Sequence, residues 1–255
     1  MLKVAFIQTS LAWEDPRKNR ENFSNKFAGL KTHADLVVLP EMFTTGFSMN
    51  AAPLAEDHDG ETLAWMLSSA RENKFAITGS VIIKEGSKYF NRLYFVTPNA
   101  DVYKYDKRHL FSLAGEEKVY TAGSDKLIVD YKGWRICPLV CYDLRFPVFA
   151  RNVENYDLLL FVANWPETRI HAWNTLLKAR AIENMAYVVG VNCTGLDGNG
   201  HLYTGSSQVL DYLGINLTES TADEIVEIVG LSQEKLQNAR EKFGFLNDRD
   251  HFTLD

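Results

Sequence analysis

The chain has 255 residues, of which 46% are hydrophobic, and a formal net charge of −6. These values are typical of a globular protein and exclude a disordered chain, while the length allows one large domain or two small ones. The acidic balance, without any cluster of Lys and Arg, argues against a nucleic-acid-binding face, and no apolar run is long enough to cross a membrane.

Strands and helices are predicted to alternate in the first half of the chain. Apolar runs and turn residues predict strands at 3–8, 36–39, 75–83, 92–96 and 102–105. Apolar residues recur at helical spacing over 19–30, where Phe23, Phe27 and Leu30 share one face, and over 61–73. This alternation predicts an α/β fold.

The second half continues the pattern. Residues 127–131 and 134–140 flank the turn Lys132-Gly133 and predict a hairpin, so the sheets are not expected to be purely parallel. Further strands are predicted at 157–162, 187–192, 207–210 and 224–229, and helices from Phe146-Pro147 and over 169–184 and 231–243. A glycine-rich loop is expected at 195–205 and a tail at 244–255. No linker divides the chain, so we expect a single domain over residues 1–255.

The three cysteines, Cys137, Cys141 and Cys193, do not indicate a disulfide framework, because their number is odd and their spacing unpaired. Their spacing does not complete a zinc site, and no metal ligand set is predicted. The N-terminal segment lacks the long apolar stretch and cleavage site of a signal peptide. Together these features predict a cytoplasmic protein whose thiols stay reduced.

Cys141 is the first candidate for chemistry. It follows the apolar run at 136–140 and precedes a strand-to-helix turn, so its side chain is expected at the mouth of a sheet, where α/β proteins bind ligands. Such a turn also leaves backbone N–H groups free to bind an oxyanion. The alternative is a buried, inert core cysteine.

Two charged residues are candidates to assist this thiol. Glu41 follows the apolar strand at 36–39, where partial desolvation suits a general base; a solvated loop acid or a helix cap is the alternative. Lys107 is placed to supply positive charge to an oxyanion, or it belongs to an exposed basic run. His109 is ranked below Glu41 as a base, because a lone histidine is often a structural hydrogen-bonding residue.

Three motifs, in the same order along the chain, resemble those of the nitrilase (carbon–nitrogen hydrolase) superfamily. They are VLPEMF at 38–43, DKRHLF at 106–111 and VCYDLRFP at 140–147, and the resemblance runs from about residue 3 to residue 217. Members of this superfamily use a catalytic Glu–Lys–Cys set, which implies Glu41, Lys107 and Cys141 here. The resemblance also implies a four-layer αββα sandwich with mixed sheets.

Further site residues follow from the resemblance. A second glutamate often follows the lysine motif and positions the lysine and the substrate; we assign this role to Glu116, with the adjacent Glu117 as the alternative. The backbone N–H of Tyr142 is expected to help bind the oxyanion. Phe43 is an expected substrate-binding residue. From its own position, at the end of the strand beside Cys141, Trp165 is also expected to line the substrate pocket, with core packing as the alternative.

A narrower resemblance is to the ω-amidase branch. It is carried by PEMFTTGFSM at 40–49, ANWP at 163–166, RAIEN at 180–184 and DGNG at 197–200. That branch hydrolyses the terminal amide of 2-oxoglutaramate and 2-oxosuccinamate to a 2-oxo diacid and ammonia, and needs no metal or organic cofactor. The substrate carboxylate needs a cationic or N–H-rich partner, but Arg145 in a strand-to-helix turn is more typical of a structural ion pair.

The resemblance also implies an oligomer, because family members usually pair through a helix face. A homodimer or higher homo-oligomer is therefore expected, with the helix at 169–184 and the tail after residue 243 as candidate contacts.

Other functions remain open at this point. Within the superfamily, the alternatives are a broad aliphatic amidase and an N-carbamoyl amino acid hydrolase. A non-catalytic scaffold is disfavoured because all three expected residue types are present. A glutaminase subunit is disfavoured because a cysteine–histidine arrangement would then be expected.

Overall fold

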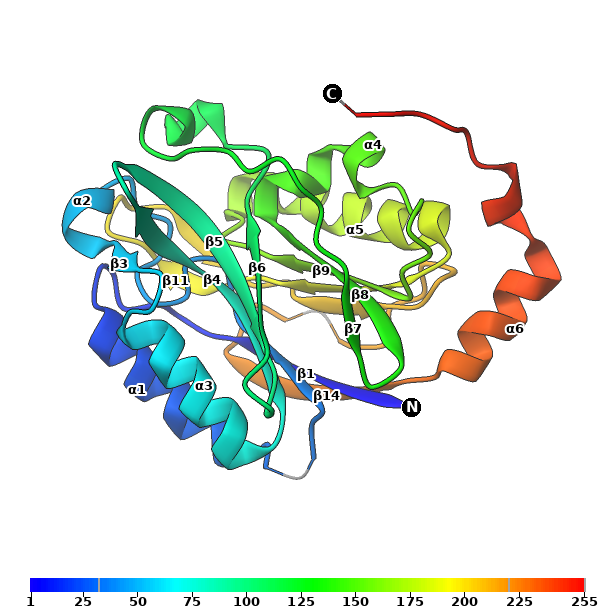
Figure 1. Cartoon of the computed structure of the whole chain (residues 1–255), viewed down its shortest axis with the longest axis horizontal. Helices are drawn as coiled ribbons and strands as arrows, with labels where there is room; N and C mark the ends of the chain where they lie inside the picture. Colours follow the sequence, from blue (N-terminus) through cyan, green and yellow to red (C-terminus); the bar gives the residue numbers. More distant parts are fainter. Residues whose placement is uncertain (32, 220, 255) are drawn as a thin grey trace.

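Two β-sheets stacked face to face form the centre of the computed structural model, which describes residues 1–31, 33–219 and 221–254 (Figure 1). The first sheet contains, in spatial order, β14 (Ile225–Leu231), β1 (Leu2–Gln8), β2 (Leu36–Val38), β4 (Ala76–Glu85), β5 (Lys88–Val96) and β6 (Val102–Asp106), with β3 (Glu56–Asp57) paired to β4. The second sheet contains β13 (Gln208–Leu210), β10 (Tyr187–Val191), β9 (Leu158–Val162), β8 (Trp134–Val140) and β7 (Val129–Tyr131). A separate ribbon is formed by β11 (Thr194–Leu196) and β12 (Leu202–Thr204).

Both sheets are mixed, as the predicted hairpin indicated. Strands β1, β2 and β4 are parallel to one another, as are β8, β9 and β10. The outer strands β14, β5, β6, β7 and β13 pair antiparallel. The carboxyl ends of the parallel strands therefore lie on one side of each sheet. Glu41 follows β2 and Cys141 follows β8 at these strand ends.

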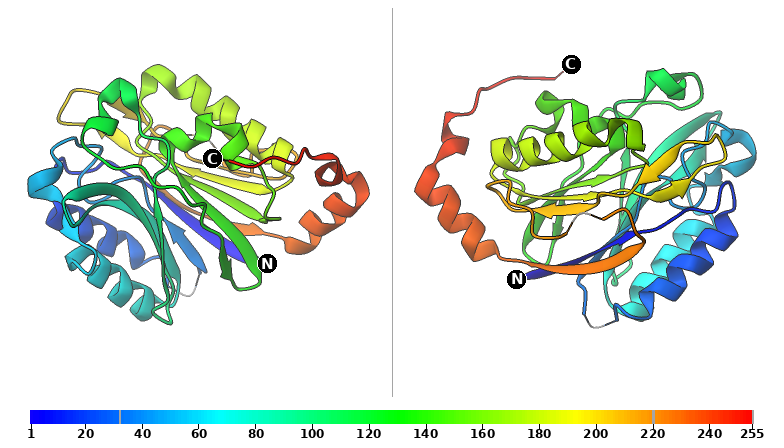
Figure 2. Two further views of the ribbon diagram at one scale, coloured as in Figure 1. Left: turned by 45° about the horizontal axis from the view of Figure 1, so that its top comes forward. Right: turned by 180° about the vertical axis from the view of Figure 1, so that it is seen from behind.

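Helices cover the outer faces of the sheets (Figures 1 and 2). Helices α1 (Pro16–Phe27) and α3 (Glu61–Asn73) pack on the first sheet, and α4 (Pro147–Ala150) and α5 (Ile170–Asn184) lie on the second. The short α2 (Ala51–Leu54) follows the Glu41 loop, and α6 (Gln233–Phe243) follows β14 and packs on the second sheet's side through Leu236 and Arg240. The predicted αββα sandwich is confirmed.

The period of two along β1 explains how the layers are held together. Ala5 and Ile7 pack with α1 and α3, whereas Val4 and Phe6 pack between the two sheets. Leu159 of β9 belongs to the same hydrophobic cluster, which continues to the underside of α5.

The structure corrects several element boundaries. The helix at 61–73 has the predicted bounds, but the one predicted at 19–30 is α1, which begins at Pro16 because Asp15 caps Lys18 N–H. The expected glycine-rich loop contains the β11–β12 hairpin, whose strands are too short for a periodic signal. The helix predicted from Phe146-Pro147 is limited to α4. The predicted tail includes a 3₁₀ turn at Phe245–Asp248, and its last residue lies outside the described part of the chain.

No helix within the described residues is both long and apolar enough to span a bilayer.

Candidate active site

Cys141 occupies a strained turn at the end of β8. Its backbone φ is +44°, in the left-handed region that non-glycine residues rarely adopt, and it opens a 3₁₀ turn over Cys141–Arg145. Asp143 holds the turn, because its carboxylate accepts the Val140 N–H at 3.0 Å. The N–H groups at the start of the turn, including that of Tyr142, have no acceptor within the helix.

Asp143 also explains the position of His109. This buried carboxylate accepts the Tyr105 hydroxyl at 2.7 Å and the backbone N–H of His109 at 3.1 Å. The His109 ring lies with Nδ1 2.7 Å from the same carboxylate and stacks on Phe146, with ring centroids 3.6 Å apart. His109 therefore supports the turn through Asp143, as expected for a structural histidine.

Glu41 is fully buried just beyond β2. Its Oε2 accepts the backbone N–H of Asn164 at 2.9 Å, and its Oε1 accepts from Lys107 Nζ at 2.9 Å. The Asn164 side chain returns to the backbone, donating from Nδ2 to the Glu41 carbonyl at 2.6 Å. Glu41 is thus a carboxylate in a fixed orientation, and it is neither a solvated loop acid nor a helix cap.

Lys107 joins two buried carboxylates. Its Nζ lies 2.8 and 3.0 Å from the two carboxylate oxygens of Glu116, in addition to the contact with Glu41. Burial alone would lower the pKa of Lys107, but the charges of Glu116 and Glu41 outweigh it and raise the pKa, so the side chain is an ammonium at neutral pH. Glu117 is exposed, which leaves Glu116 as the glutamate beside the lysine.

The surroundings of Cys141 favour its thiol form over the thiolate. Burial raises its pKa well above the ordinary value, and the Glu41 carboxylate adds to this effect through its charge and a hydrogen bond, while the Lys107 ammonium opposes it. Burial also raises the pKa of Glu116, with the charge of Lys107 acting against it and that of Glu41 acting with it. A nucleophilic thiol in this environment needs a base that removes its proton during the reaction.

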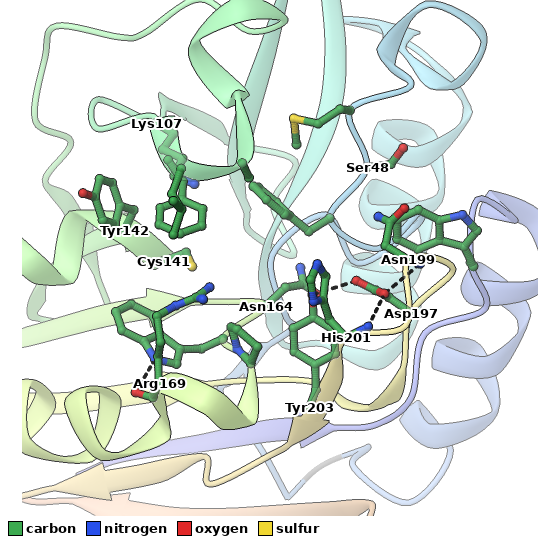
Figure 3. A pocket seen from close by; sticks show the side chains of 18 of the residues that line it. Ser48, Lys107, Cys141, Tyr142, Asn164, Arg169, Asp197, Asn199, His201 and Tyr203 are labelled. Atoms are coloured by element: carbon green, nitrogen blue, oxygen red, sulfur yellow. Dashed lines mark hydrogen bonds between the residues drawn. The ribbon is translucent and has the colours of Figure 1, made fainter.

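A cavity of about 520 Å³ opens onto Cys141 and Lys107 (Figure 3). Trp165 and Tyr142 line it, so Trp165 is a wall of the cavity as well as a neighbour of Trp173 in the core. The expectation for Phe43 is wrong: its side chain is fully buried among Phe23 and Trp65 on the helix side of the first sheet, away from this cavity. Other lining residues are Trp13, Glu14, Phe47, Ser48, Met49, Asn50, Phe111, Asn164, Asp197, Asn199, His201 and Tyr203.

Two arginines of the cavity were not assigned from the sequence. The Arg145 guanidinium lies over the Trp165 ring, 5.1 Å from its centroid, and that of Arg169 lies over Phe111 at 4.9 Å. Neither forms an ion pair with a described residue, so Arg145 is not the structural ion-pair residue that its sequence context favoured. Figure 3 places Arg169 at the Cys141 end of the cavity and Asp197, Asn199 and Ser48 at the other.

Within the described ranges, no group of three or more His, Cys, Asp and Glu side chains is arranged to hold a metal ion.

The model of the carbon–nitrogen hydrolase family matches residues 3–241 of the sequence. Since this match covers most of the chain, the protein belongs to the carbon–nitrogen hydrolase family of the nitrilase superfamily, as the three motifs predicted. The structure brings residues of all three motifs together, with Glu41 and Lys107 in contact and Cys141 lining the same cavity as Lys107.

Relatives of known activity are similar over the full length. Omega-amidase YafV of Escherichia coli K12 is 46% identical, over 99% of this chain and 98% of that protein. A 2-oxoglutaramate amidase from Bacillus subtilis is 30% identical, over 96% of each chain. The crystal structure of a superfamily protein from Xanthomonas campestris, which carries an arsenic adduct in its active site, is 46% identical with a TM-score of 0.98 and covers 100% of this chain and 99% of that one.

Proposed function

We propose that this protein is an ω-amidase, which hydrolyses the terminal carboxamide of 2-oxo acid amides such as 2-oxoglutaramate and 2-oxosuccinamate. The observation that carries the proposal is the convergence of Glu41, Lys107 and Cys141 at one end of a cavity with unpaired arginines. The similarity to an omega-amidase and a 2-oxoglutaramate amidase supports the substrate class.

In the proposed reaction, Cys141 Sγ attacks the amide carbon while Glu41 accepts the thiol proton. The electron pair of the carbonyl moves onto oxygen, where the Lys107 ammonium and the Tyr142 N–H stabilise the negative charge. The C–N bond then breaks, Glu41 gives its proton to the leaving nitrogen, and ammonia departs. The product of this half-reaction is a thioester on Cys141.

Water completes the cycle. Glu41 takes a proton from the water as its oxygen attacks the thioester carbon, and a second oxyanion forms at the same position. Collapse of this intermediate breaks the C–S bond, the Glu41 proton returns to sulfur, and the 2-oxo diacid leaves. Glu116 positions the Lys107 ammonium. Because Lys107 is buried away from water, its charge attracts the thiolate and the oxyanion strongly.

The substrate carboxylate is proposed to bind Arg145, with Arg169 close by. A guanidinium offers paired N–H donors that match a carboxylate, and stacking on an aromatic ring fixes its plane. A simple aliphatic amide has no group for these arginines. Two unpaired cations in the cavity therefore favour an acidic amide over a neutral one.

A substrate panel tests this function. We expect kcat/KM for 2-oxoglutaramate to exceed that for glutamine, propionamide, a nitrile and an N-carbamoyl amino acid by roughly 100-fold or more, the size of a lost charged hydrogen-bond pair. Ammonia release measures the hydrolysis of the amides and of the N-carbamoyl amino acid. The reaction of the nitrile is measured by the disappearance of the nitrile itself. A preference for any other member of the panel overturns the substrate assignment.

The Arg145→Gln variant, assayed on the same panel, tests whether Arg145 binds the substrate carboxylate. It is expected to raise KM for 2-oxoglutaramate roughly 10- to 100-fold while changing propionamide hydrolysis by less than about threefold, because only the former has a carboxylate to lose. Equal losses on both amides would place Arg145 outside the carboxylate site.

We further propose a homodimer that uses α5 and the C-terminal segment. Val148, Ile182, Phe245 and Phe252, whose side chains are 38–55% exposed, line a groove between α4, α5 and this segment. The charged residues Arg151, Glu183 and Asp250 line the same groove. Figure 2 shows the C-terminal segment extended across this side of the molecule. Light scattering is expected to give twice the chain mass of 29.0 kDa, and Phe245→Asp is expected to give a monomer. Val226→Asp, on the outer strand β14, is the control; a wild-type monomer contradicts the proposal.

Two further proposals concern the chain as a whole. The hydrophobic core shared by both sheets supports a single domain over residues 1–255, with 244–255 as its tail. The three free cysteines support a reducing, cytoplasmic location.

A further inference from the structure

Asn91 of β5 connects the two carboxylates of the site. Its Nδ2 donates to Glu41 Oε1 at 2.8 Å and to Glu116 Oε1 at 3.2 Å. Both oxygens also accept from Lys107 Nζ, at 2.9 and 3.0 Å. The four contacts form a closed ring of hydrogen bonds in which ammonium and amide donors alternate with carboxylate acceptors.

The Asn91 side chain is placed for its donors. Asn91 is 1% exposed, and its Oδ1 has no hydrogen-bond partner among the described residues. An acceptor that is buried without a partner costs stability, so the position is not explained by structural hydrogen bonding alone. The Asn91 carbonyl in addition accepts the backbone N–H of Lys107 at 3.0 Å.

The ring determines which oxygen of Glu41 remains available. Oε1 has two donors, Asn91 and Lys107, whereas Oε2 has the Asn164 N–H alone at 2.9 Å. A carboxylate oxygen accepts two hydrogen bonds, so Oε2 retains a lone pair for the Cys141 proton.

The ring also fixes how the two carboxylates lie. Lys107 and Asn91 each donate to Glu41 Oε1 and to Glu116 Oε1, so neither carboxylate can turn without losing a donor.

We propose that Asn91 is a positioning residue of the reaction: it fixes the orientation of the Glu41 carboxylate and leaves oxygen Oε2 of Glu41 as the acceptor of the Cys141 proton. The proposal rests on the proposed role of Glu41 as base and does not depend on which amide is the substrate. Asn91 does not line the cavity, so it acts through Glu41 and has no contact with substrate.

The test compares Asn91→Leu and Asn91→Asp with Thr78→Val. Asn91→Leu removes the donors, and Asn91→Asp replaces them with a third carboxyl group of the same shape. Thr78 is a matched control, because it is fully buried on the neighbouring strand β4 and its hydroxyl has no partner among the described residues. Thermal unfolding verifies that each variant is folded, and Asn91→Ser, which keeps one donor, is expected to be intermediate.

Both Asn91 variants are expected to lower kcat roughly 10- to 100-fold with little change in KM. Without the Asn91 donor, Glu41 Oε1 retains only Lys107, so the carboxylate can turn and Oε2 loses its fixed position as the proton acceptor. A purely structural role would instead lower the folded fraction and leave the kcat of the folded enzyme unchanged.

Alkylation of Cys141 by iodoacetate, which has no amide group, measures deprotonation of the thiol independently of amide hydrolysis. Glu41→Gln should slow this alkylation and so identify Glu41 as the base. An alkylation rate and a kcat in both Asn91 variants equal to those of Thr78→Val overturn the proposal. If the wild type hydrolyses no amide, the proposed function fails, and the alkylation rate alone decides the role of Asn91.

Discussion

Replacing Cys141 with alanine is expected to lower kcat/KM for amide hydrolysis by at least about 10⁴-fold, because the reaction loses its nucleophile and no other thiol opens into the cavity. Of the other two cysteines, Cys137 is buried within β8 and Cys193 lies behind Asn164. The change keeps the side-chain β-carbon, so the left-handed turn at residue 141 is retained. Thermal unfolding should therefore stay close to that of the wild type.

Mass spectrometry checks the chemical role of the same thiol. Acid quenching during turnover should trap an acyl adduct on the wild-type chain, and Cys141→Ala should show none. Cys137→Ala is the control, since it removes a neighbouring cysteine of β8 and should retain both the adduct and most of the activity. Hydrolysis that persists in the Cys141→Ala variant would remove the thioester mechanism.

Replacing Lys107 with methionine is expected to have the second largest effect. Loss of a donor to an oxyanion typically costs roughly 10²–10³-fold in kcat, and here the ammonium also holds Glu41 in place. The substitution leaves Glu41 and Glu116 buried without a counter-ion. Removing one partner of a buried ion pair costs about 3–5 kcal/mol of unfolding free energy.

This loss of stability should depend on pH. Burial already raises the pKa of Glu116, and without the Lys107 charge the pKa rises further. A carboxyl group whose pKa is higher in the folded than in the unfolded state stabilises the fold while it is protonated and loses that contribution as the pH rises through the folded-state pKa. The variant should therefore be more destabilised at about pH 8 than at about pH 5.

Thermal unfolding at both pH values measures this effect. Lys104→Met, on an exposed part of β6, is the control and should shift stability little at either pH. Lys107→Met combined with Glu116→Gln should regain part of the stability but not the activity. A Lys107→Met variant as stable as the wild type at about pH 8 would show that the carboxylates are not held by this charge.

The candidate site was only partly predictable from the sequence. Glu41, Lys107 and Cys141 were found through motifs, because each follows or adjoins an apolar strand with recognisable neighbours. Asn91 gave no signal, since a single asparagine in a strand has no pattern of its own. Phe43 was misassigned because a residue two positions from Glu41 can face either side of the turn, and its neighbours in space decided that it faces the core.

The sequence by itself determined the alternation of strands and helices, since apolar periodicity and turn residues are local properties. It also determined the chemical groups available, an acid, an ammonium and a thiol. Only the tertiary structure decided that the acid and the ammonium form one buried ion pair beside the thiol, that Glu116 and not Glu117 joins them, and that two arginines enter the cavity without an ion partner among the described residues. The physical reason is that protonation, burial and hydrogen bonding depend on contacts between residues far apart in the sequence, which no local pattern encodes. Glu41 and Asn164, for example, are 123 positions apart.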